Sequence, residues 1–115
     1  MVLSNAQMLG SIEVLSQLEE KGMLGYAIAR NRQKLLAELV DYANKRDELA
    51  REYGKDKGNG QYQFDSESGP KFLAALKPYS DLTVDVAVMR VSPEVFCGGN
   101  LTSQQMYILY WMVEE

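Results

Sequence analysis

The feature that most constrains this fold is an unbroken amphipathic stretch from Tyr26 to Tyr53. Apolar side chains recur there seven residues apart, and the set comprises Ile28, Leu35, Tyr42 and Leu49, with Leu39 between the second and third. This spacing predicts one long α-helix with a single apolar stripe. Such a helix would be ~42 Å long, whereas a compact domain of this chain length has a diameter of only about 34 Å. The helix is therefore predicted to extend beyond its own globule.

A projecting helix end with an apolar stripe needs a second helix to cover it, most simply one from another copy of the chain. We therefore predict a homo-oligomer, with a dimer favoured. Its interface is expected on the long helix, at Ile28, Leu35, Leu39, Tyr42 and Leu49. The opposite face has oppositely charged residues four apart, which predicts three ion pairs: Lys34 with Glu38, Asp41 with Lys45, and Asp47 with Arg51.

Two nearly identical hexapeptides, LSNAQM at 3–8 and LTSQQM at 101–106, mark helix starts. In each, a hydroxyl residue precedes a glutamine by three positions, which is the capping-box pattern. The pairs are Ser4 with Gln7 and Thr102 with Gln105. The flanking pairs Leu3–Met8 and Leu101–Met106 are spaced as hydrophobic staples. No fixed period follows, so the two hexapeptides indicate helix starts and not an internal repeat.

The remaining segments predict short elements. The first helix is expected from Asn5 to Lys21, ended by Gly22, and residues 54–60 are expected to be a flexible loop. Strands are predicted at 61–64 and 83–91. Between them a brief helix is predicted within 65–78, with Pro70 near its start and Pro78 as its stop. Ser92 should cap a short helical turn. The final helix, from Ser103, holds the run MYILYWMV, which is apolar on every side and therefore predicted to be buried on every side, Trp111 included.

Together these elements predict a single α+β domain over residues 1–115. It would comprise an N-terminal helical hairpin with one long helix (1–53), a loop (54–60) and a smaller α+β portion (61–115). That last portion would hold a small antiparallel β-sheet and a buried C-terminal helix.

The composition argues against catalysis. The chain has no histidine and one cysteine, Cys97, so it lacks the base of a Ser-His or Cys-His pair and the common zinc ligands. We predict no enzyme activity, no metal and no cofactor. A lone cysteine is typical of a reducing cytosol, and the N-terminus lacks the pattern of a signal peptide. No apolar run approaches the ~20 residues of a membrane span. The predicted location is cytoplasmic, without membrane association.

The charge distribution bears on partners. The net charge is −4, and the deficit lies in residues 61–115, which have three basic and seven acidic side chains. An acidic surface repels phosphate backbones, which argues against general nucleic-acid binding and suits a basic protein partner.

Two groups of residues are candidate contacts for a partner or ligand. Arg30, Arg32 and Lys34 lie close together near the start of the long helix, where they are either a solvated face or a contact for an acidic partner. Tyr107 and Tyr110 lie with Trp111 in the last helix, where aromatic residues are either core or the anchors of an interface.

Four stretches that together cover most of the chain are LSNAQML, YAIARNRQKLLAEL continuing to RDELAREYG, VDVAVMRV and LTSQQMYILYWMVEE. In these stretches the chain resembles a family of small uncharacterised proteins encoded by phages and prophages, a domain of unknown function. It implies a setting in the bacterial cytoplasm during infection or lysogeny. It transfers no active site.

Three hypotheses of function follow. The first is a non-enzymatic binding protein that inhibits or sequesters a host defence component, either a protein or a small nucleotide signal. The second is a virion-assembly factor such as a tail or head chaperone, and the third, least favoured, is an enzyme.

Overall fold

The computed structural model describes residues 1–114 and shows a small α+β fold made mostly of helices. In chain order the elements are β1 (Val2–Ser4), α1 (Asn5–Leu15), α2 (Gly22–Glu38), α3 (Val40–Tyr53), β2 (Lys55–Gly58), β3 (Gln61–Gln63), α4 (Ser68–Ser80), β4 (Thr83–Asp85), α5 (Pro93–Cys97), α6 (Ser103–Ile108) and the 3₁₀ helix η1 (Tyr110–Met112).

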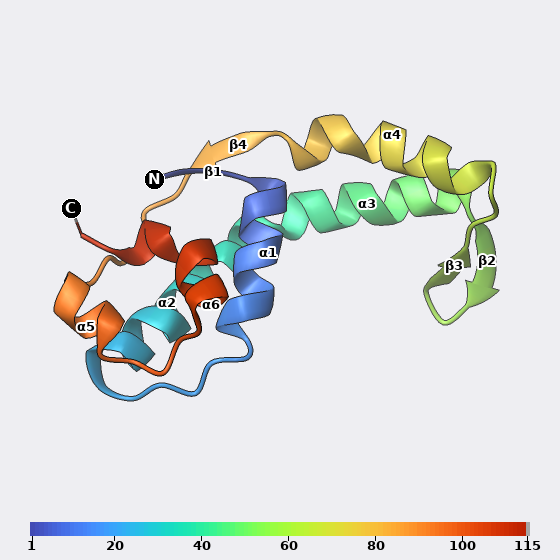
Figure 1. Cartoon of the computed structure of the whole chain (residues 1–115). Helices are drawn as coiled ribbons and strands as arrows, with labels where there is room; N and C mark the ends of the chain where they lie inside the picture. Colours follow the sequence, from blue (N-terminus) through green and yellow to red (C-terminus); the bar gives the residue numbers. More distant parts are fainter. Residues whose placement is uncertain (115) are drawn as a thin grey trace.

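The molecule has two parts, a globule and an arm (Figure 1). Helices α1, α2, α5, α6 and η1 form the globule, while α3 and α4 run side by side away from it and end at the β2–β3 hairpin. The principal extents are 48 × 25 × 22 Å and the radius of gyration is 16.6 Å, against about 13 Å for a compact domain of this length. The predicted overhang is therefore present.

The predicted long helix is two helices. It begins at Gly22 and breaks at Leu39, whose N–H is shared between the carbonyls of Leu35 (3.1 Å) and Leu36 (3.3 Å). The break separates α2, which packs on α1, from α3, which packs on α4. Neither glycine nor proline marks this position, so the local sequence contains no signal for it.

The predicted hairpin of helices is present, but its first helix ends early. Helix α1 stops at Leu15 instead of Lys21, and residues 16–21 connect it to α2. A tertiary contact holds this connection, because the Glu20 carboxylate accepts a hydrogen bond from the Asn100 backbone N–H at 2.6 Å. Gly22 is the first residue of α2 and has a φ of +66°, so it starts the second helix and does not cap the first.

Both capping boxes are confirmed. Ser4 accepts from the Gln7 N–H at 3.0 Å while Gln7 accepts from the Ser4 N–H at 2.8 Å. The corresponding distances between Thr102 and Gln105 are 3.2 and 2.9 Å. The predicted Ser92 cap is also present, with its hydroxyl accepting from the Val95 N–H.

The strands are shorter than predicted and form two separate pairs. Strand β1 pairs antiparallel with β4 in the register Leu3↔Val84, and β2 pairs with β3. Part of the predicted loop 54–60 is therefore strand β2, with Gly58, Asn59 and Gly60 at positive φ in the turn. The predicted strand 83–91 is regular only over β4.

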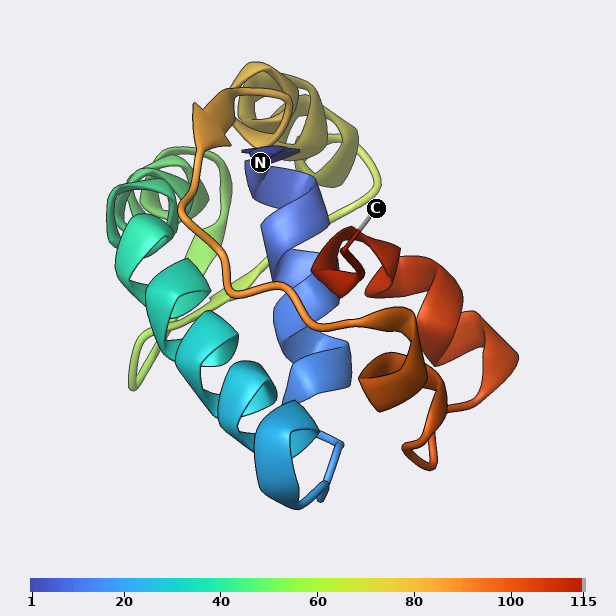
Figure 2. The same ribbon diagram turned by 90° about the vertical axis from the view of Figure 1, so that its left-hand side faces the viewer.

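Beyond β4, residues 86–91 continue as an extended segment across α1, between α2 and α6 (Figure 2). Both ends of this segment are buried, at Val86 and Val91. Val91 pairs with the C-terminal residues, donating to the Met112 carbonyl at 2.7 Å and accepting from the Glu114 N–H at 2.8 Å. The segment therefore joins the two ends of the chain.

Pro78 does not stop the fourth helix. Helix α4 continues through it to Ser80, and Pro78 and Ala74 are both exposed. The Ala74 carbonyl, four residues back, loses its helical donor to the proline, but its exposure leaves it open to water. The prediction that α4 ends at Pro78 is wrong for that reason.

The C-terminal helix is not buried on every side. No residue of α6 is fully buried, and Tyr107 and Tyr110 are 83% and 70% exposed. Leu109 and Met112 fill the core instead, and Trp111 is half-buried against it. The apolar run therefore has a core face and a solvent face, because α6 and η1 lie on the surface of the globule.

Candidate functional site

The stripe predicted as an oligomer interface lies in the core of the single chain. Its five residues, Ile28, Leu35, Leu39, Tyr42 and Leu49, are all buried. Helix α1 packs on α2, and α4 packs on α3, so the partner helix for the projecting end comes from the same chain. These side chains are packed within one chain, which leaves them little surface for the interface predicted there.

None of the three ion pairs predicted for the long helix forms within residues 1–114, and Lys45 pairs with Glu48 in place of Asp41. Lys45 lies 3.5 Å from Glu48 and 5.1 Å above the Tyr79 ring of α4. The Glu48 carboxylate, followed by Tyr79, raises the pKa of Lys45. Packing of α4 against α3 therefore draws Lys45 away from Asp41.

The basic residues Arg30, Arg32 and Lys34 do not form one surface. Successive helical residues are turned by about 100°, so Arg32 points away from the other two. The Arg30 guanidinium donates to the Tyr26 hydroxyl at 3.5 Å, whereas Arg32 Nε donates to Ser16 Oγ at 3.0 Å. Lys34 is half-buried. Of the three, Arg32 lines the cavity described below.

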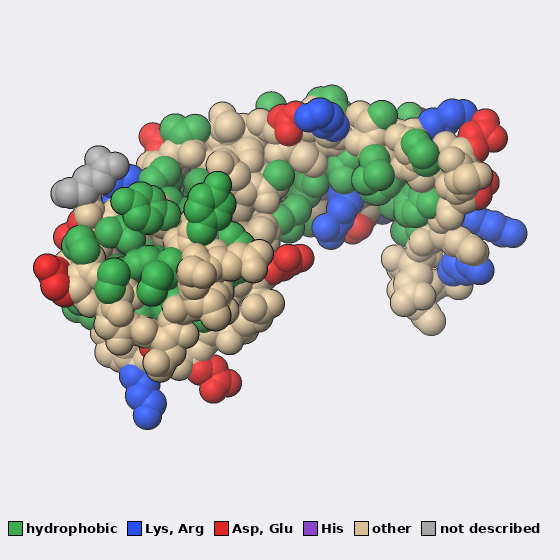
Figure 3. Space-filling model, in the orientation of Figure 1, with side chains coloured by type: hydrophobic (Ala, Val, Ile, Leu, Met, Phe, Trp, Pro, Cys, Tyr) green, Lys and Arg blue, Asp and Glu red, His purple; other side chains and the backbone are tan. Residues whose placement is uncertain are grey.

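The exposed tyrosines border a groove between α5 and the end of the chain. We call it the α5–α6 groove, and its cavity volume is about 400 Å³. Its lining is mostly apolar and comprises Pro93, Phe96, Cys97, Ser103, Met106, Tyr107, Tyr110, Val113 and Glu114. Figure 3 shows hydrophobic side chains gathered over this part of the globule.

The walls of the α5–α6 groove are held by contacts outside it. The Ser92 cap starts α5, whose Phe96 is buried, and the Thr102 capping box starts α6. Trp111 Nε1 donates to Ser11 Oγ at 3.1 Å, which ties η1 to α1. Met112 and Leu109 anchor the same segment in the core. Tyr107 and Tyr110 are therefore presented on a rigid support.

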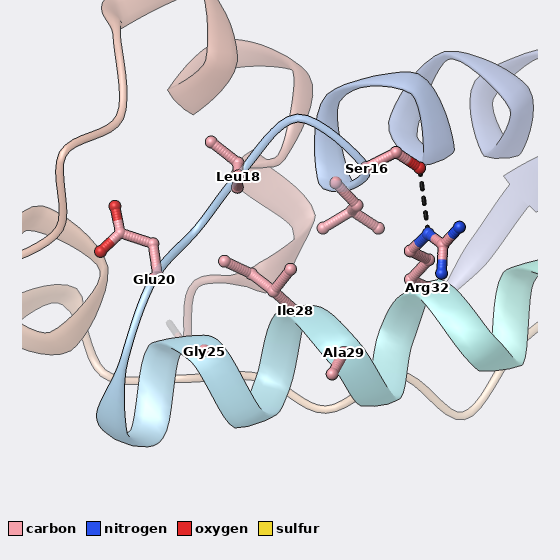
Figure 4. A pocket seen from close by; sticks show the side chains of 8 residues that line it. Ser16, Leu18, Glu20, Gly25, Ile28, Ala29 and Arg32 are labelled. Atoms are coloured by element: carbon pink, nitrogen blue, oxygen red, sulfur yellow. Dashed lines mark hydrogen bonds between the residues drawn. The ribbon is translucent and has the colours of Figure 1, made fainter.

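A second cavity, of about 520 Å³, lies between the end of α1, residues 16–20 and α2 (Figure 4). Leu15, Leu18 and Ile28 contribute apolar surface to it. Arg32 lies at one end with its guanidinium held by Ser16, and Glu20 lies at the other end (Figure 4). The single cation in this lining is Arg32.

The described residues contain no group of three or more His, Cys, Asp or Glu side chains placed to hold a metal ion. Cys97 is a free thiol exposed at the end of α5. None of the helices in residues 1–114 is both long and apolar enough to cross a membrane. What the arrangement offers chemically is an apolar groove bordered by exposed aromatic side chains.

Sequence reasoning missed Asn31, which is fully buried. Its side-chain amide donates to the Met89 carbonyl at 2.8 Å and accepts from the Met89 N–H at 2.7 Å. A signal was available, because Asn31 lies three residues after Ile28 and four before Leu35, on the apolar stripe. A polar residue at a core position indicates a buried hydrogen-bond partner.

Comparisons with known proteins identify no relative: no family model, no curated protein and no solved structure matches this chain.

Proposed function

We propose that this chain is a non-enzymatic binding protein that engages a partner protein through the α5–α6 groove. The observation that carries the proposal is the exposure of Tyr107 and Tyr110 on an apolar groove. Tyrosine is among the residues most enriched at interface hot spots, because it offers a large apolar area at low entropic cost. Aromatic side chains that only served the core would face Leu109 and Met112.

The biological setting proposed for this binding rests on the resemblance to phage and prophage proteins alone. In that setting the partner is a bacterial defence component in the host cytoplasm, which the chain inhibits or sequesters. The alternative is a virion-assembly factor, for which an exposed aromatic surface would hold a structural protein before assembly.

The experiment is a plaque assay in host strains that carry defence systems, with the protein expressed from a plasmid. We expect wild type to restore plaque formation and the double variant Tyr107→Ala/Tyr110→Ala to lose that effect. Tyr26→Ala is the matched control, because Tyr26 is 58% exposed on α2 and does not line the groove. Protection by the double variant at the wild-type level would refute the proposal.

The assembly alternative makes a different prediction in the same phage. Deletion of the gene would then abolish particle formation in a host without any defence system. Normal particle yield from the deletion mutant would remove this alternative.

A second candidate is binding of a small nucleotide signal, favoured by the second cavity. There the Arg32 guanidinium, oriented by Ser16, adjoins apolar side chains, and Arg groups of this kind bind phosphate. Titration calorimetry with a nucleoside monophosphate tests it. Binding should be lost in Arg32→Gln and kept in Arg30→Gln. If the heat of binding were unchanged in Arg32→Gln, this cavity would be excluded as the nucleotide-binding site.

A further inference from the structure

The α5–α6 groove is an apolar surface without a covering element in the described chain. Met106, Tyr107 and Tyr110 present one face of the C-terminal segment to it, and Pro93 and Phe96 form the facing side on α5. Tyrosines left 83% and 70% exposed would lose most of that exposure against a partner. This area is where an occupant would gain the most apolar contact.

The charged residues at the groove indicate whether its occupant should carry positive or negative charge. Glu114 lines the groove, and Glu94 follows the lining residue Pro93 on α5. Both side chains are exposed, and neither belongs to an ion pair within residues 1–114. None of the lining residues is Lys or Arg, and Arg90, like Glu94, lies outside the lining. An occupant with basic side chains would therefore complement this surface.

The same charges disfavour a second copy of the chain as the occupant. A symmetric dimer through the groove would bring together the Glu94 and Glu114 carboxylates of both copies in one interface. Like charges placed together in an interface oppose association. A partner with basic side chains would be attracted to these carboxylates, whereas a second copy would be repelled by them.

The shape of the groove indicates the conformation of the occupant. Its walls are helices, with α6 and η1 on one side and α5 on the other. The cavity of about 400 Å³ between them is open to the apolar anchors that a helix presents at i, i+3 or i+4, and i+7. An amphipathic helix lying in an apolar groove is a common mode of peptide recognition.

We propose that the α5–α6 groove binds a short basic amphipathic helix of a partner protein. Its apolar face contacts Tyr107, Tyr110 and Met106, and its Lys or Arg side chains lie near Glu94 and Glu114. This inference rests on the proposed function, since it names the chemistry of the partner at the same groove.

The test uses fluorescein-labelled synthetic helical peptides and the full chain, with binding followed by fluorescence anisotropy. The probe peptide has leucines at i, i+3, i+4 and i+7 and lysines at the solvent positions. One control peptide replaces every lysine with glutamate, and another keeps the lysines but replaces every leucine with alanine. We expect only the leucine–lysine peptide to bind, and to bind more weakly as salt is raised.

Variants then locate the binding site. Tyr107→Ala/Tyr110→Ala should weaken binding about tenfold or more, as loss of interface anchors does. Glu94→Gln/Glu114→Gln should weaken it several-fold and reduce its salt dependence. Tyr26→Ala and Glu19→Gln are matched controls at exposed positions outside the groove, and they should leave affinity unchanged. All variants should melt at the wild-type temperature, because the altered side chains are exposed.

Several results would overturn the inference. They are equal binding of the leucine–glutamate peptide, no binding of any peptide, and binding unaffected by the tyrosine pair. Dimerisation of wild type that is lost in the tyrosine variant would assign the groove to a second copy. Co-sedimentation with anionic lipid vesicles, lost in the same variant, would assign it to a membrane surface.

The plaque assay separates failure of this inference from failure of the proposed function. If the tyrosine variant loses protection but no basic peptide binds, the groove is the binding site and the partner chemistry is wrong. If the tyrosine variant keeps full protection, the groove itself is not the functional surface.

Discussion

Three side chains of the core bond to chain segments that are remote in sequence. Asn31 bonds to both backbone groups of Met89, Asn5 Nδ2 donates to the Tyr79 carbonyl at 2.8 Å, and Trp111 bonds to Ser11. Asn5, Ser11 and Asn31 are buried, so the cost of leaving these polar side chains unpaired is high. Apolar packing alone would allow several placements of the extended segment and of η1, and these polar contacts select one of them.

At the residue scale we predict that Asn31→Ala lowers the free energy of unfolding by roughly 2–3 kcal/mol, because the Met89 N–H and carbonyl lose their buried partners. Urea denaturation followed by circular dichroism measures this. The control is Gln33→Ala, an exposed position on the same helix, which should change stability by less than about 0.5 kcal/mol. Equal stability of the two variants would mean that Met89 finds other partners.

A second prediction at this scale compares neighbouring aromatic residues. Trp111→Ala should cost about 2–3 kcal/mol, somewhat less than the loss of a fully buried aromatic side chain, because Trp111 is half-buried. Tyr110→Ala should cost less than about 0.5 kcal/mol, because Tyr110 is exposed. Thermal melts of both variants test this. Comparable losses would indicate that Tyr110 packs in the core.

At the scale of elements, hydrogen bonds between neighbouring residues mark where several of the helices begin. The two capping boxes start α1 and α6, and a third arrangement precedes α4. There Asp65 Oδ1 accepts from the N–H groups of Glu67 (2.9 Å) and Ser68 (2.7 Å). Ser68 Oγ accepts in return from the Asp65 N–H at 3.0 Å. These exposed ends need no tertiary contact to form.

The Asp65 cap predicts a pH dependence. The Ser68 and Glu67 N–H groups, with the Ser68 hydroxyl, lower the pKa of the Asp65 carboxyl in the folded chain. A lowered folded pKa adds stability above the unfolded pKa, and that stability is lost as the pH falls through the folded value. Asp65→Ala should therefore melt below wild type at neutral pH, with a difference that shrinks in acid.

Asp65→Asn separates the charge from the cap, because it keeps an acceptor oxygen that does not titrate in this range. Its melting temperature should depend less on pH than that of wild type. Asp47→Ala is the control at an exposed carboxylate of α3. A pH-independent difference between wild type and Asp65→Ala would show that the carboxylate charge has no part in the cap.

At the scale of the whole molecule, an arm projects from a globule and is covered by its own chain. The arm has few buried residues, namely Tyr42, Leu49 and Ala50 on α3 and Leu76 on α4. At its tip the Phe64 and Phe72 rings stack at 4.6 Å. A Cβ at Gly54 would lie 3.0 Å from the Phe64 ring, so this close approach favours glycine. The hairpin is thereby attached to the end of α3 and α4.

The thin core of the arm predicts uneven stability. Backbone amides of β2, β3 and the adjoining end of α3 should exchange with solvent faster than those of α1, because local opening there exposes fewer buried contacts. Native-state hydrogen exchange measures this by mass spectrometry of peptic fragments. Equal protection in the arm and in α1 would indicate one cooperative unit.

Because Leu35 is buried, the substitution Leu35→Glu should unfold the chain. The sequence alone predicts instead that it would dissociate a dimer. Leu35→Glu places a charge at a site with no exposure and should cost about 4 kcal/mol or more. The adjacent Leu36 is 43% exposed, so Leu36→Glu should keep the fold. Light scattering with melting curves tests both. If Leu35→Glu were a folded monomer while wild type is a dimer, the dimer interface would lie at Leu35 as the sequence predicts. If Leu35→Glu unfolds, any dimer must form through another surface.

The sequence by itself determined the α+β class, the starts of α1, α5 and α6, and the apolar stripe along α2 and α3. Those features depend on residues within one or two helical turns, so local patterns contain them. Only the tertiary structure decided that α4 covers the α3 part of the stripe, that the helix breaks at Leu39, and that Asn31 meets Met89. It alone also turned Tyr107 and Tyr110 outward from an apolar run. The physical reason is that each of these outcomes depends on which surface a segment meets, and the segments that meet here are far apart in the chain.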